Sequence, residues 1–452
     1  MGPTSDTPLR PQDSGLLPRL LAELGLRPDT LTLPARAVQA VPLPSHLAVG
    51  ELAWTSIGAA AAAIGTASAD DDWHPLLPDP DLVADAYRSD RYLRVDGEAI
   101  EGFAPLSGFW RTADGWVRTH GNYAHHAAAL RTGLRLRNGA TPDEVASVLR
   151  TMTSVQAMTA VQAHGGLCVP VRQEAPREDA ALRATPLIQV SRLGDSRPRA
   201  LPRPTAASPL SGIRVLDLTR VIAGPVATRT LAFAGAEVLR LDPPMREEIS
   251  WQHFDTGHGK RTALLDIAAD RERFDALLAD ADVIVLGYRP DGLRRLGLDP
   301  QSLVSRHPQL VVAQLSAWPG DDSARGFDSI VQAACGISWA DSVDGQLPGA
   351  LPAQALDHSA GYLLAAGITA ALCRRAEAGG SWYVRTSLRQ VAAELLGMPR
   401  GEPRRAPEHE VRTQEFEVGG QRVTTVEPAV RWPGGPVRFA APRPWGADAP
   451  EW

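Results

Sequence analysis

The stretch SGIRVLDLTRVIAGPVATRTLAFAGAEVLRLD, residues 211–242, decides the fold of this chain. It reads as a short apolar strand, a helix of small residues that begins at a Gly-Pro step, and a second apolar strand. Two strands joined through a helix pack side by side as a parallel pair, with a right-handed crossover. The stretch therefore predicts an α/β fold.

The same alternation of strand and helix continues downstream. The predicted elements are strands at 261–267, 281–288 and 309–318 and helices at 270–280 and 299–307. We expect one open, mainly parallel, Rossmann-like sheet with helices on both faces, in a large domain that spans residues 212–398. In such sheets ligands bind beyond the carboxyl ends of the strands.

The rest of the chain divides by composition. We expect an N-terminal helical and irregular segment at 1–80, a smaller α+β domain at 81–193, a linker rich in Pro, Arg and Ser at 194–211, and a Pro- and Gly-rich tail with a small hairpin at 399–452. Two patterns indicate the smaller domain: a hairpin around an Ala-Asp-Gly turn, and a capping box formed by Thr141 and Glu144.

Composition excludes several classes of protein. A net charge of −6 gives no general footprint for nucleic acid or for an anionic membrane. The polar residues 1–15 do not resemble a signal peptide, and the Ala-rich window at 52–67 is too weakly apolar to span a membrane. Cys168, Cys335 and Cys373 form no C-x-x-C pair, so we expect reduced thiols and a cytoplasmic protein.

Motifs for common cofactors are missing from the expected places. The first strand-to-helix turn contains one glycine and a proline, which disfavours a nicotinamide or flavin cofactor. No P-loop pattern is present either. His120, His125 and His126 cluster without Asp, Glu or Cys at ligand spacing, so we expect no metal and interpret them as loop histidines beside a substrate or an interface.

The carboxylate of Asp357 lies at the N-terminus of a long helix predicted from LDHSAGYLLAAGITAAL, residues 356–372. Asp357 in this position suits a structural N-cap, because Asp accepts hydrogen bonds from free backbone N–H groups. It equally suits a nucleophile whose ionised form the helix dipole favours. The spacing alone leaves both roles open.

Basic residues lie near the strand ends of the predicted sheet. They are Arg240, Lys260, Arg261, Arg289, Arg294 and Arg295. Each of these residues, taken alone, is typical of a solvent-exposed surface. Together, in a net-acidic protein, they indicate a local site for an anionic phosphate group.

Five ordered blocks give the chain a specific resemblance. Residues 211–242, followed by GKRTALLDI, ADVIVLGYRPDGLRRLGL, RGFDSIVQAACGI and LDHSAGYLLAAGITAAL, resemble class III CoA-transferases of the CaiB/BaiF type. SGFWRTADGWVRTHGNYAHH at 107–126 resembles the smaller domain of that family, which usually follows the large one. The chain thus resembles a rearranged or fused member. Trp54 stands where an apparent internal copy of the Asp357 motif would carry its carboxylate.

The resemblance implies roles for particular residues. It implies Asp357 as the catalytic aspartate. Backbone N–H groups must stabilise the oxyanion that an attack by Asp357 would create, and Gly361, Gly165 and Gly166 are candidates for the close backbone approach this needs. The resemblance implies that coenzyme A is held by Val221, Ile222, Arg240, Gly287, Tyr288 and Arg295, with Lys260 and Arg261 nearby. It also implies a homodimer, which can be interlocked.

The implied reaction moves CoA from an acyl-CoA to a small carboxylic acid through an aspartyl anhydride and an aspartyl thioester. A racemase branch of the family uses a histidine where this chain has Phe327, which favours acyl transfer here. Two alternatives stay open: an α-methylacyl-CoA racemase or epimerase, and a degenerate protein that binds CoA without catalysis.

Overall fold

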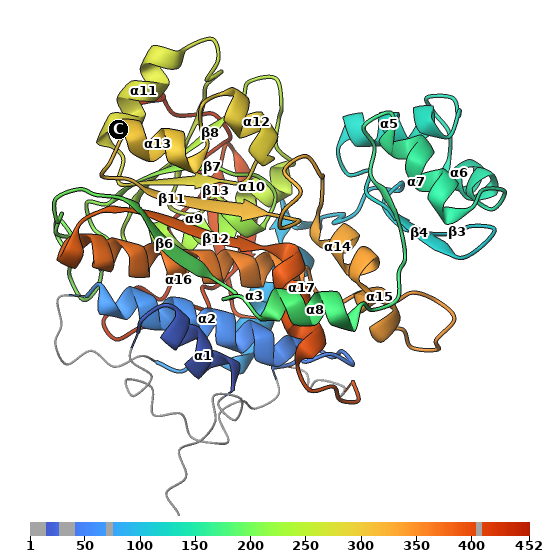
Figure 1. The fold of residues 1–452 in the computed structure, drawn as a ribbon, viewed down its shortest axis with the longest axis horizontal. Coiled ribbons are helices and arrows are strands. Elements are labelled where there is room, and N and C mark those ends of the chain that lie inside the picture. Colours follow the sequence, from blue (N-terminus) through green and yellow to red (C-terminus); the bar gives the residue numbers. More distant parts are fainter. Residues whose placement is uncertain (1–14, 27–40, 69–75, 404–408) are drawn as a thin grey trace, which may run out of the picture.

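A seven-stranded sheet forms the centre of the computed structural model, which describes residues 15–26, 41–68, 76–403 and 409–452 (Figure 1). Its strand order is β6 (Gln189–Gly194), β12 (Ser381–Ser387), β11 (Val311–Ser316), β10 (Val283–Leu286), β7 (Arg214–Leu218), β8 (Glu237–Asp242) and β9 (Arg261–Leu264). All neighbours are parallel except β6, which runs antiparallel to β12. The predicted mainly parallel α/β fold is confirmed.

Helices cover both faces of the sheet, because successive strand residues point to opposite sides. Val215 and Val285 belong to the core beneath α9 (Ala223–Phe233) and α16 (Ala355–Ala378). Leu216 and Ile284 belong to the opposite core, which includes residues of α11 (Arg271–Asp280) and α13 (Pro300–Arg306).

The N-terminal segment contains α2 (Val49–Thr66), which packs against α16 on the side away from the sheet (Figure 1). Its residues 52–65 are all buried, and α1 (Leu16–Glu23) packs against it in turn. The N-terminal segment thus adds a helical layer to the main core. The prediction about a signal peptide at 1–15 falls almost wholly outside the described residues.

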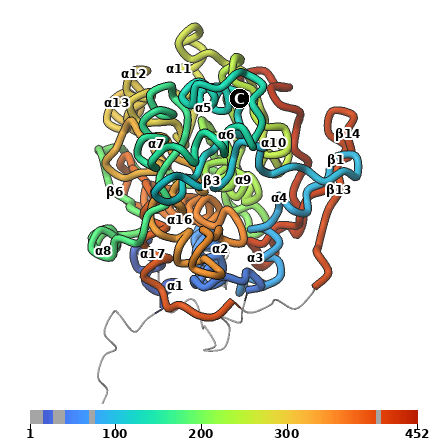
Figure 2. The backbone as a smooth tube through the Cα atoms, turned by 90° about the vertical axis from the view of Figure 1, so that its right-hand side faces the viewer, coloured from blue at the N-terminus to red at the C-terminus, as the bar shows by residue number. Residues whose placement is uncertain are grey.

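A separate lobe, here called the small lobe and comprising residues 102–171, has its own core; it lies to the right in Figure 1 and faces the viewer in Figure 2. Its antiparallel sheet contains β3 (Phe109–Arg111), β4 (Trp116–Thr119) and β5 (Cys168–Pro170), accompanied by α5 (Ala124–Gly133), α6 (Pro142–Leu149) and α7 (Ser154–Gln162). The predicted hairpin and the capping box of Thr141 and Glu144 are both present.

The elements on either side of the small lobe join the main body, so residues 81–193 do not pack as one unit. They are α3 (Pro80–Tyr87), α4 (Ser89–Tyr92), β1 (Arg94–Val95), β2 (Glu98–Ala99), α8 (Pro176–Arg183) and β6. Helix α8 packs on α17 (Leu388–Gly397), and β1 pairs with β14 (Gln421–Val426) of the C-terminal hairpin. Pairing with distant segments gives these short elements the hydrogen bonds and burial that they cannot supply alone.

The remaining elements lie between the large sheet and the small lobe, or at the edges of the large sheet. They are α10 (Ser250–Thr256), α12 (Pro290–Arg295), α14 (Asp328–Cys335), α15 (Ile337–Ala340) and β13 (Thr413–Val418), the partner of β14. The predicted linker has no helix or strand after Gly194. No helix in the described ranges is both long and apolar enough to cross a membrane.

Candidate active site

The strand order of the large sheet reverses between β7 and β10. From β7 the chain proceeds outward through β8 and β9, then returns to β10 on the other side. In open α/β sheets the crevice at such a switch point, beyond the carboxyl ends of the strands, is the usual ligand site. Val221 and Ile222 follow β7, and Gly287 and Tyr288 follow β10. The structure therefore brings four of the predicted coenzyme-binding residues together.

The backbone in this crevice is unusually constrained. Val221 has a φ of 73°, in the left-handed region that a β-branched residue rarely adopts. The Gly287 N–H donates to the Leu218 carbonyl over 3.1 Å, which ties the two loops together. A Cβ at Gly287 would lie 3.1 Å from the Thr219 side chain, so this exposed position favours glycine.

Asp357 lies in the first turn of α16 and is 6% exposed. It is not the cap of the helix, because α16 begins two residues earlier, at Ala355. The capping carboxylate is Asp328, which accepts the N–H groups of Leu356 at 2.8 Å and of Asp357 at 3.0 Å. Within the described residues, the Asp357 carboxylate has no hydrogen bond or ion pair of its own. The structure thus leaves it free for another role.

Asp357 opens into a cavity of about 20 Å³, enough for about one water molecule. The cavity lies where the switch point, α14 and the small lobe meet. Its lining includes Asp328, Val221, Ile222, His120, Asn122 and Phe327. Two predicted coenzyme-binding residues therefore share a cavity with the predicted catalytic aspartate.

The two carboxyl groups in this cavity influence each other's ionisation. Burial, and then the charge of Asp328, raise the pKa of Asp357 well above its ordinary value. Burial likewise raises the pKa of Asp328 to about 6, against the opposing effect of its hydrogen bonds. Like charges in a low-dielectric site disfavour double ionisation. The protonation state of Asp357 therefore depends on its neighbour.

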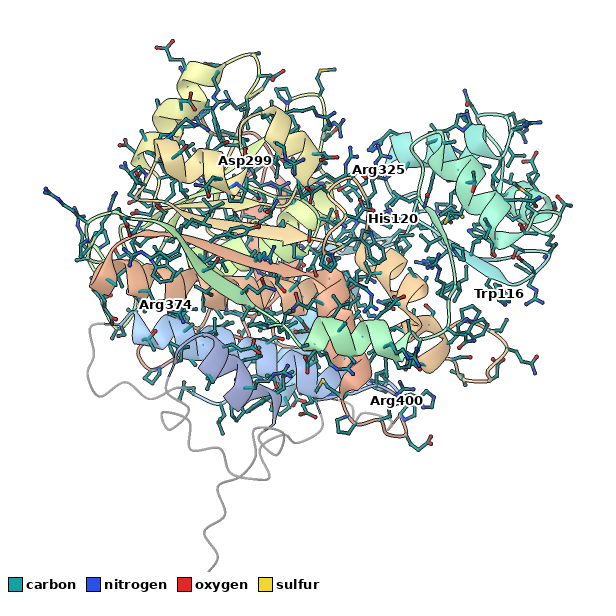
Figure 3. All side chains as sticks on the ribbon, in the orientation of Figure 1. Trp116, His120, Asp299, Arg325, Arg374 and Arg400 are labelled. Carbon is teal, nitrogen blue, oxygen red and sulfur yellow. The ribbon has the colours of Figure 1, made fainter. Side chains whose placement is uncertain are left out.

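His120 also lines this cavity, although nothing in the sequence pairs it with Asp357. Its ring stacks on Phe327 with 3.9 Å between centroids and 7° between planes, at the junction of the small lobe and the main body (Figure 3). Burial, followed by His126 and Arg118, lowers the pKa of His120 to about 3, so the imidazole is neutral at pH 7. Its Nδ1 has no hydrogen-bond partner among the described residues. No local signal joins two positions so distant in sequence.

The neighbouring His125 and His126 lie near the same junction, but in the first turn of α5 and not in a loop as predicted. The rings of His125 and His126 are 4.1 Å apart between centroids, and His126 is 6.3 Å from His120. No group of three or more potential metal ligands is present within the ranges that the structure describes.

Arg240 and Lys260 lie inside the protein, already paired, although their positions predicted phosphate binding. Arg240 is 1% exposed and contacts Asp242 and Glu248, each at 2.7 Å. Lys260 is 2% exposed and contacts Asp217 at 3.1 Å. Arg240 lies within β8 and Lys260 precedes β9, so neither follows the carboxyl end of a strand, where ligands bind.

Arg261 and Arg295, the other cations of the predicted coenzyme site, have different surroundings. Arg261 lies 3.9 Å from Asp448 at the far edge strand β9. Arg295 is exposed at the end of α12 and has no ion pair with any described residue. It is thus open to an anionic ligand.

Three arginines form an unpaired cationic cluster near the junction: Arg246, Arg289 and Arg325 (Figure 3 labels Arg325). Burial, and then the charges of Arg289 and Arg246, lower the pKa of Arg325. Neither Arg246 nor Arg325 has an ion-pair partner in the described part of the chain. Mutually repelling cations without counter-ions favour binding of an anion such as phosphate. Of the three, the sequence interpretation included only Arg289.

The glycines proposed for close backbone approach have packing roles. A Cβ at Gly361 would lie 2.5 Å from the Ala223 carbonyl oxygen, so this glycine lets α16 approach α9. A Cβ at Gly166 would lie 2.6 Å from the Val161 side chain. Gly165 has a φ of 80° and ends a turn after α7.

Comparison with known proteins agrees with this architecture. Residues 210–427 match the family described as CoA-transferase family III. The "Probable fatty acyl-CoA transferase Rv3272" of Mycobacterium tuberculosis is 32% identical over 213 residues, which cover 43% of this chain and 54% of the relative. The "Acetyl-coenzyme A transferase nodX" of Hypoxylon pulicicidum is 36% identical over 191 residues, covering 40% of this chain and 32% of the relative.

A crystal structure of Rv3272 aligns with a TM-score of 0.40 and 33% identity, over 42% of this chain and 56% of that one. The chain thus spans about half the length of Rv3272 and about a third of nodX. The shared region contains the switch point, Asp328 and Asp357, whereas the small lobe lies before it. Through residues 210–427, just under half of its length, the chain is thus similar to CoA-transferase family III.

Proposed function

We propose that this chain transfers CoA from an acyl-CoA thioester to a carboxylic acid, with Asp357 as the nucleophile. The observation that carries this proposal is the free, buried carboxylate of Asp357, which shares a cavity with Val221 and Ile222 at the switch point of the sheet. The relatives Rv3272 and nodX are named as CoA-transferases, which supports the same class of reaction.

The reaction begins when ionised Asp357 attacks the thioester carbonyl. A C–O bond forms, the C–S bond breaks, and the CoA thiolate leaves, which is feasible because a thiol has a pKa of roughly 8.5. The thiolate then attacks the aspartyl carbonyl of the anhydride, which releases the first acid and gives an aspartyl-CoA thioester. The acceptor carboxylate attacks that thioester, and CoA finally takes the new acyl group, which regenerates Asp357.

Ionisation of Asp357 is the step that the protein makes difficult. A desolvated carboxylate is more nucleophilic than a hydrated one, but its raised pKa reduces the ionised fraction. Positioning supplies the compensating gain, because Asp357 is fixed in the first turn of a helix that Asp328 caps. The same Asp328 occupies the N–H groups of Leu356 and Asp357, so an oxyanion needs other donors.

The phosphates of CoA would then lie along the exposed cations between the switch point and the junction. Arg246, Arg289 and Arg325 supply unpaired charge there, and Arg295 lies further along the same edge. Arg240 and Lys260 support the site indirectly, by holding its buried acids.

Replacement of Asp357 tests the proposal. We expect Asp357→Asn to abolish CoA exchange, because a neutral amide cannot form the anhydride, and to leave the fold intact. Hydroxylamine or borohydride added during turnover should trap an acyl or CoA adduct, which mass spectrometry would locate on the Asp357 peptide. Unchanged exchange in Asp357→Asn would overturn the assignment.

A second candidate, the racemase or epimerase, gains support from one observation. Phe327 cannot transfer a proton, but neutral His120 stacks on it and shares the cavity with Asp357. A histidine and a carboxylate on one cavity suit proton exchange at the α-carbon of a thioester. Deuterium wash-in at that carbon would favour this candidate. Tight acyl-CoA binding with neither wash-in nor exchange would favour a CoA-binding protein without catalysis.

A further inference from the structure

A second, larger cavity of about 360 Å³ adjoins the one that contains Asp357. It lies between the small lobe and the segment that leads into α16. The two cavities share four lining residues: Asp90, Gly102, Phe103 and Gln354. Asp357 lines only the small cavity, so the large one lies a step beyond the reacting atoms.

Arg118 of strand β4 lines this larger cavity and does not line the smaller one. It is 8% exposed, and its guanidinium carbon lies 5.1 Å from the ring centroid of Phe103 and 4.8 Å from that of Phe109. Its buried Nε has no hydrogen-bond partner, and no described residue forms an ion pair with it. Burial lowers the pKa of Arg118 to about 10, against the opposing charge of Asp328, so it stays a cation at pH 7.

A second unpaired donor faces the same space. Ser329, at 7% exposed, has a buried hydroxyl without a partner among the described residues. The neighbouring Gln332 is satisfied, because it donates to Asp328 and accepts the Leu351 N–H. The acidic side chain in the lining is Asp90. Burial, followed by the charge of Asp255, raises the pKa of Asp90, so a negative charge on Asp90 competes less with a bound carboxylate for Arg118. A buried cation and a buried hydroxyl together lack an acceptor.

We propose that this cavity binds the second carboxylate of a dicarboxylic acid, or of its CoA monothioester, through Arg118 and Ser329. A guanidinium and a hydroxyl that line one cavity supply the positive charge and the hydrogen-bond donors that a carboxylate needs. The phenyl rings of Phe103 and Phe109 leave apolar surface for the methylene chain between the two carboxyl groups. Because Arg118 is absent from the cavity of Asp357, it recognises the remote carboxyl group rather than the reacting one. The inference rests on the proposed transfer at Asp357.

The test compares glutarate with butyrate, which has nearly the same chain length but lacks the second carboxyl group. For the full chain, we expect glutarate to bind more tightly in calorimetry and to show a higher kcat/KM as CoA acceptor. Arg118→Met should reduce the preference for glutarate by roughly 10- to 100-fold, the usual value of a charge-assisted hydrogen bond. Arg118→Lys should keep part of the preference, and Ser329→Ala should lose less than Arg118→Met.

Arg111→Met is the matched control. Arg111 lies on the adjacent strand β3 and contacts a Trp116 ring at 5.5 Å, but it is exposed and lines neither cavity. It should retain the preference in full. Circular dichroism of each variant separates a folding defect from a loss of recognition. If Arg118→Met does not fold, the substrate preference of Arg118→Lys tests the inference instead.

The possible failures are distinguishable. Equal use of glutarate and butyrate by the unaltered chain, with Arg118→Met unchanged, would overturn the inference and leave CoA transfer intact. Glutarate binding that depends on Arg118, in a chain without CoA exchange, would support the carboxylate site and overturn the proposed transfer.

Discussion

Asp328 affects Asp357 in two ways, and a substitution can remove one of them while keeping the other. Its carboxylate accepts two N–H groups at the start of α16, and its charge opposes the ionisation of Asp357. An amide in its place keeps an acceptor oxygen but has no charge. Substitution can therefore distinguish the structural contribution from the electrostatic one.

We expect Asp328→Asn to shift the acidic limb of the pH–rate profile to lower pH, because the pKa of Asp357 falls when the neighbouring charge is removed. The profile of kcat/KM against pH measures this. Asp328→Ala serves as the structural comparison. It should lower the free energy of unfolding by about 1–3 kcal/mol, the cost of leaving buried N–H groups unpaired. An unmoved acidic limb in Asp328→Asn would show that the two groups titrate independently.

At the level of elements, strand β8 and the segment after it contain a buried ionic cluster. Arg240 contacts Asp242 and Glu248, and Glu248 also accepts from the Tyr123 hydroxyl at 2.7 Å. Tyr123 belongs to the small lobe, so this cluster connects the lobe to the main body. Burial opposes ionisation of Glu248, but Arg240 and Arg220 outweigh it and lower the pKa of Glu248 to about 2.

We expect Glu248→Gln to lower the free energy of unfolding by about 3–5 kcal/mol, because it leaves the Arg240 charge buried with one partner fewer. Tyr123→Phe, the control, removes one hydrogen bond and should cost about 0.5–1.5 kcal/mol. Since the pKa of Glu248 is depressed on folding, its stabilisation is present above its ordinary value of 4.5 and is lost as pH falls toward about 2. Denaturant titrations at several pH values measure both effects; an acid dependence that Glu248→Gln does not reduce would contradict the assignment.

Elements that depend on local pattern were predictable, and contacts between distant elements were not. Strands β7, β8 and β10 and helix α9 follow from apolar runs and turn residues, and they place Val221 and Gly287 at the correct edge of the sheet. The burial of Arg240 depends on Glu248, whose partnership no periodicity reveals. His120 and Arg118 reach the site from a lobe whose docking position the sequence does not specify.

In the molecule as a whole, the small lobe and the large domain of one chain meet at the candidate site. The small lobe contributes His120 and Asn122, and the large sheet and α16 contribute Val221 and Asp357. The placement of the small lobe before the large domain thus permits assembly of the site without a second subunit. A homodimer, as the family resemblance implies, stays a prediction that a mass measurement in solution would test.

A complementation experiment tests assembly within one chain. Asp357→Asn removes the nucleophile, and His120→Trp fills the small cavity from the lobe side. We expect mixtures of the two variants, refolded or co-expressed together, to stay inactive, because neither chain contains an intact site. Exchange of lobes between subunits would instead restore about a quarter of the activity of the unaltered protein, from one intact site in half of the dimers.

The burial of α2 against α16 has a consequence for biosynthesis. The helix at Val49–Thr66 is buried around most of its circumference, and its principal partner is Ala355–Ala378, about 300 residues later. At about 5–20 residues per second, a ribosome takes roughly 15–60 s to deliver that partner. Throughout this interval the nascent chain presents an uncovered apolar helix, which is the kind of segment that chaperones bind. Overproduction should therefore yield more correctly folded protein when translation is slowed or chaperone capacity is raised.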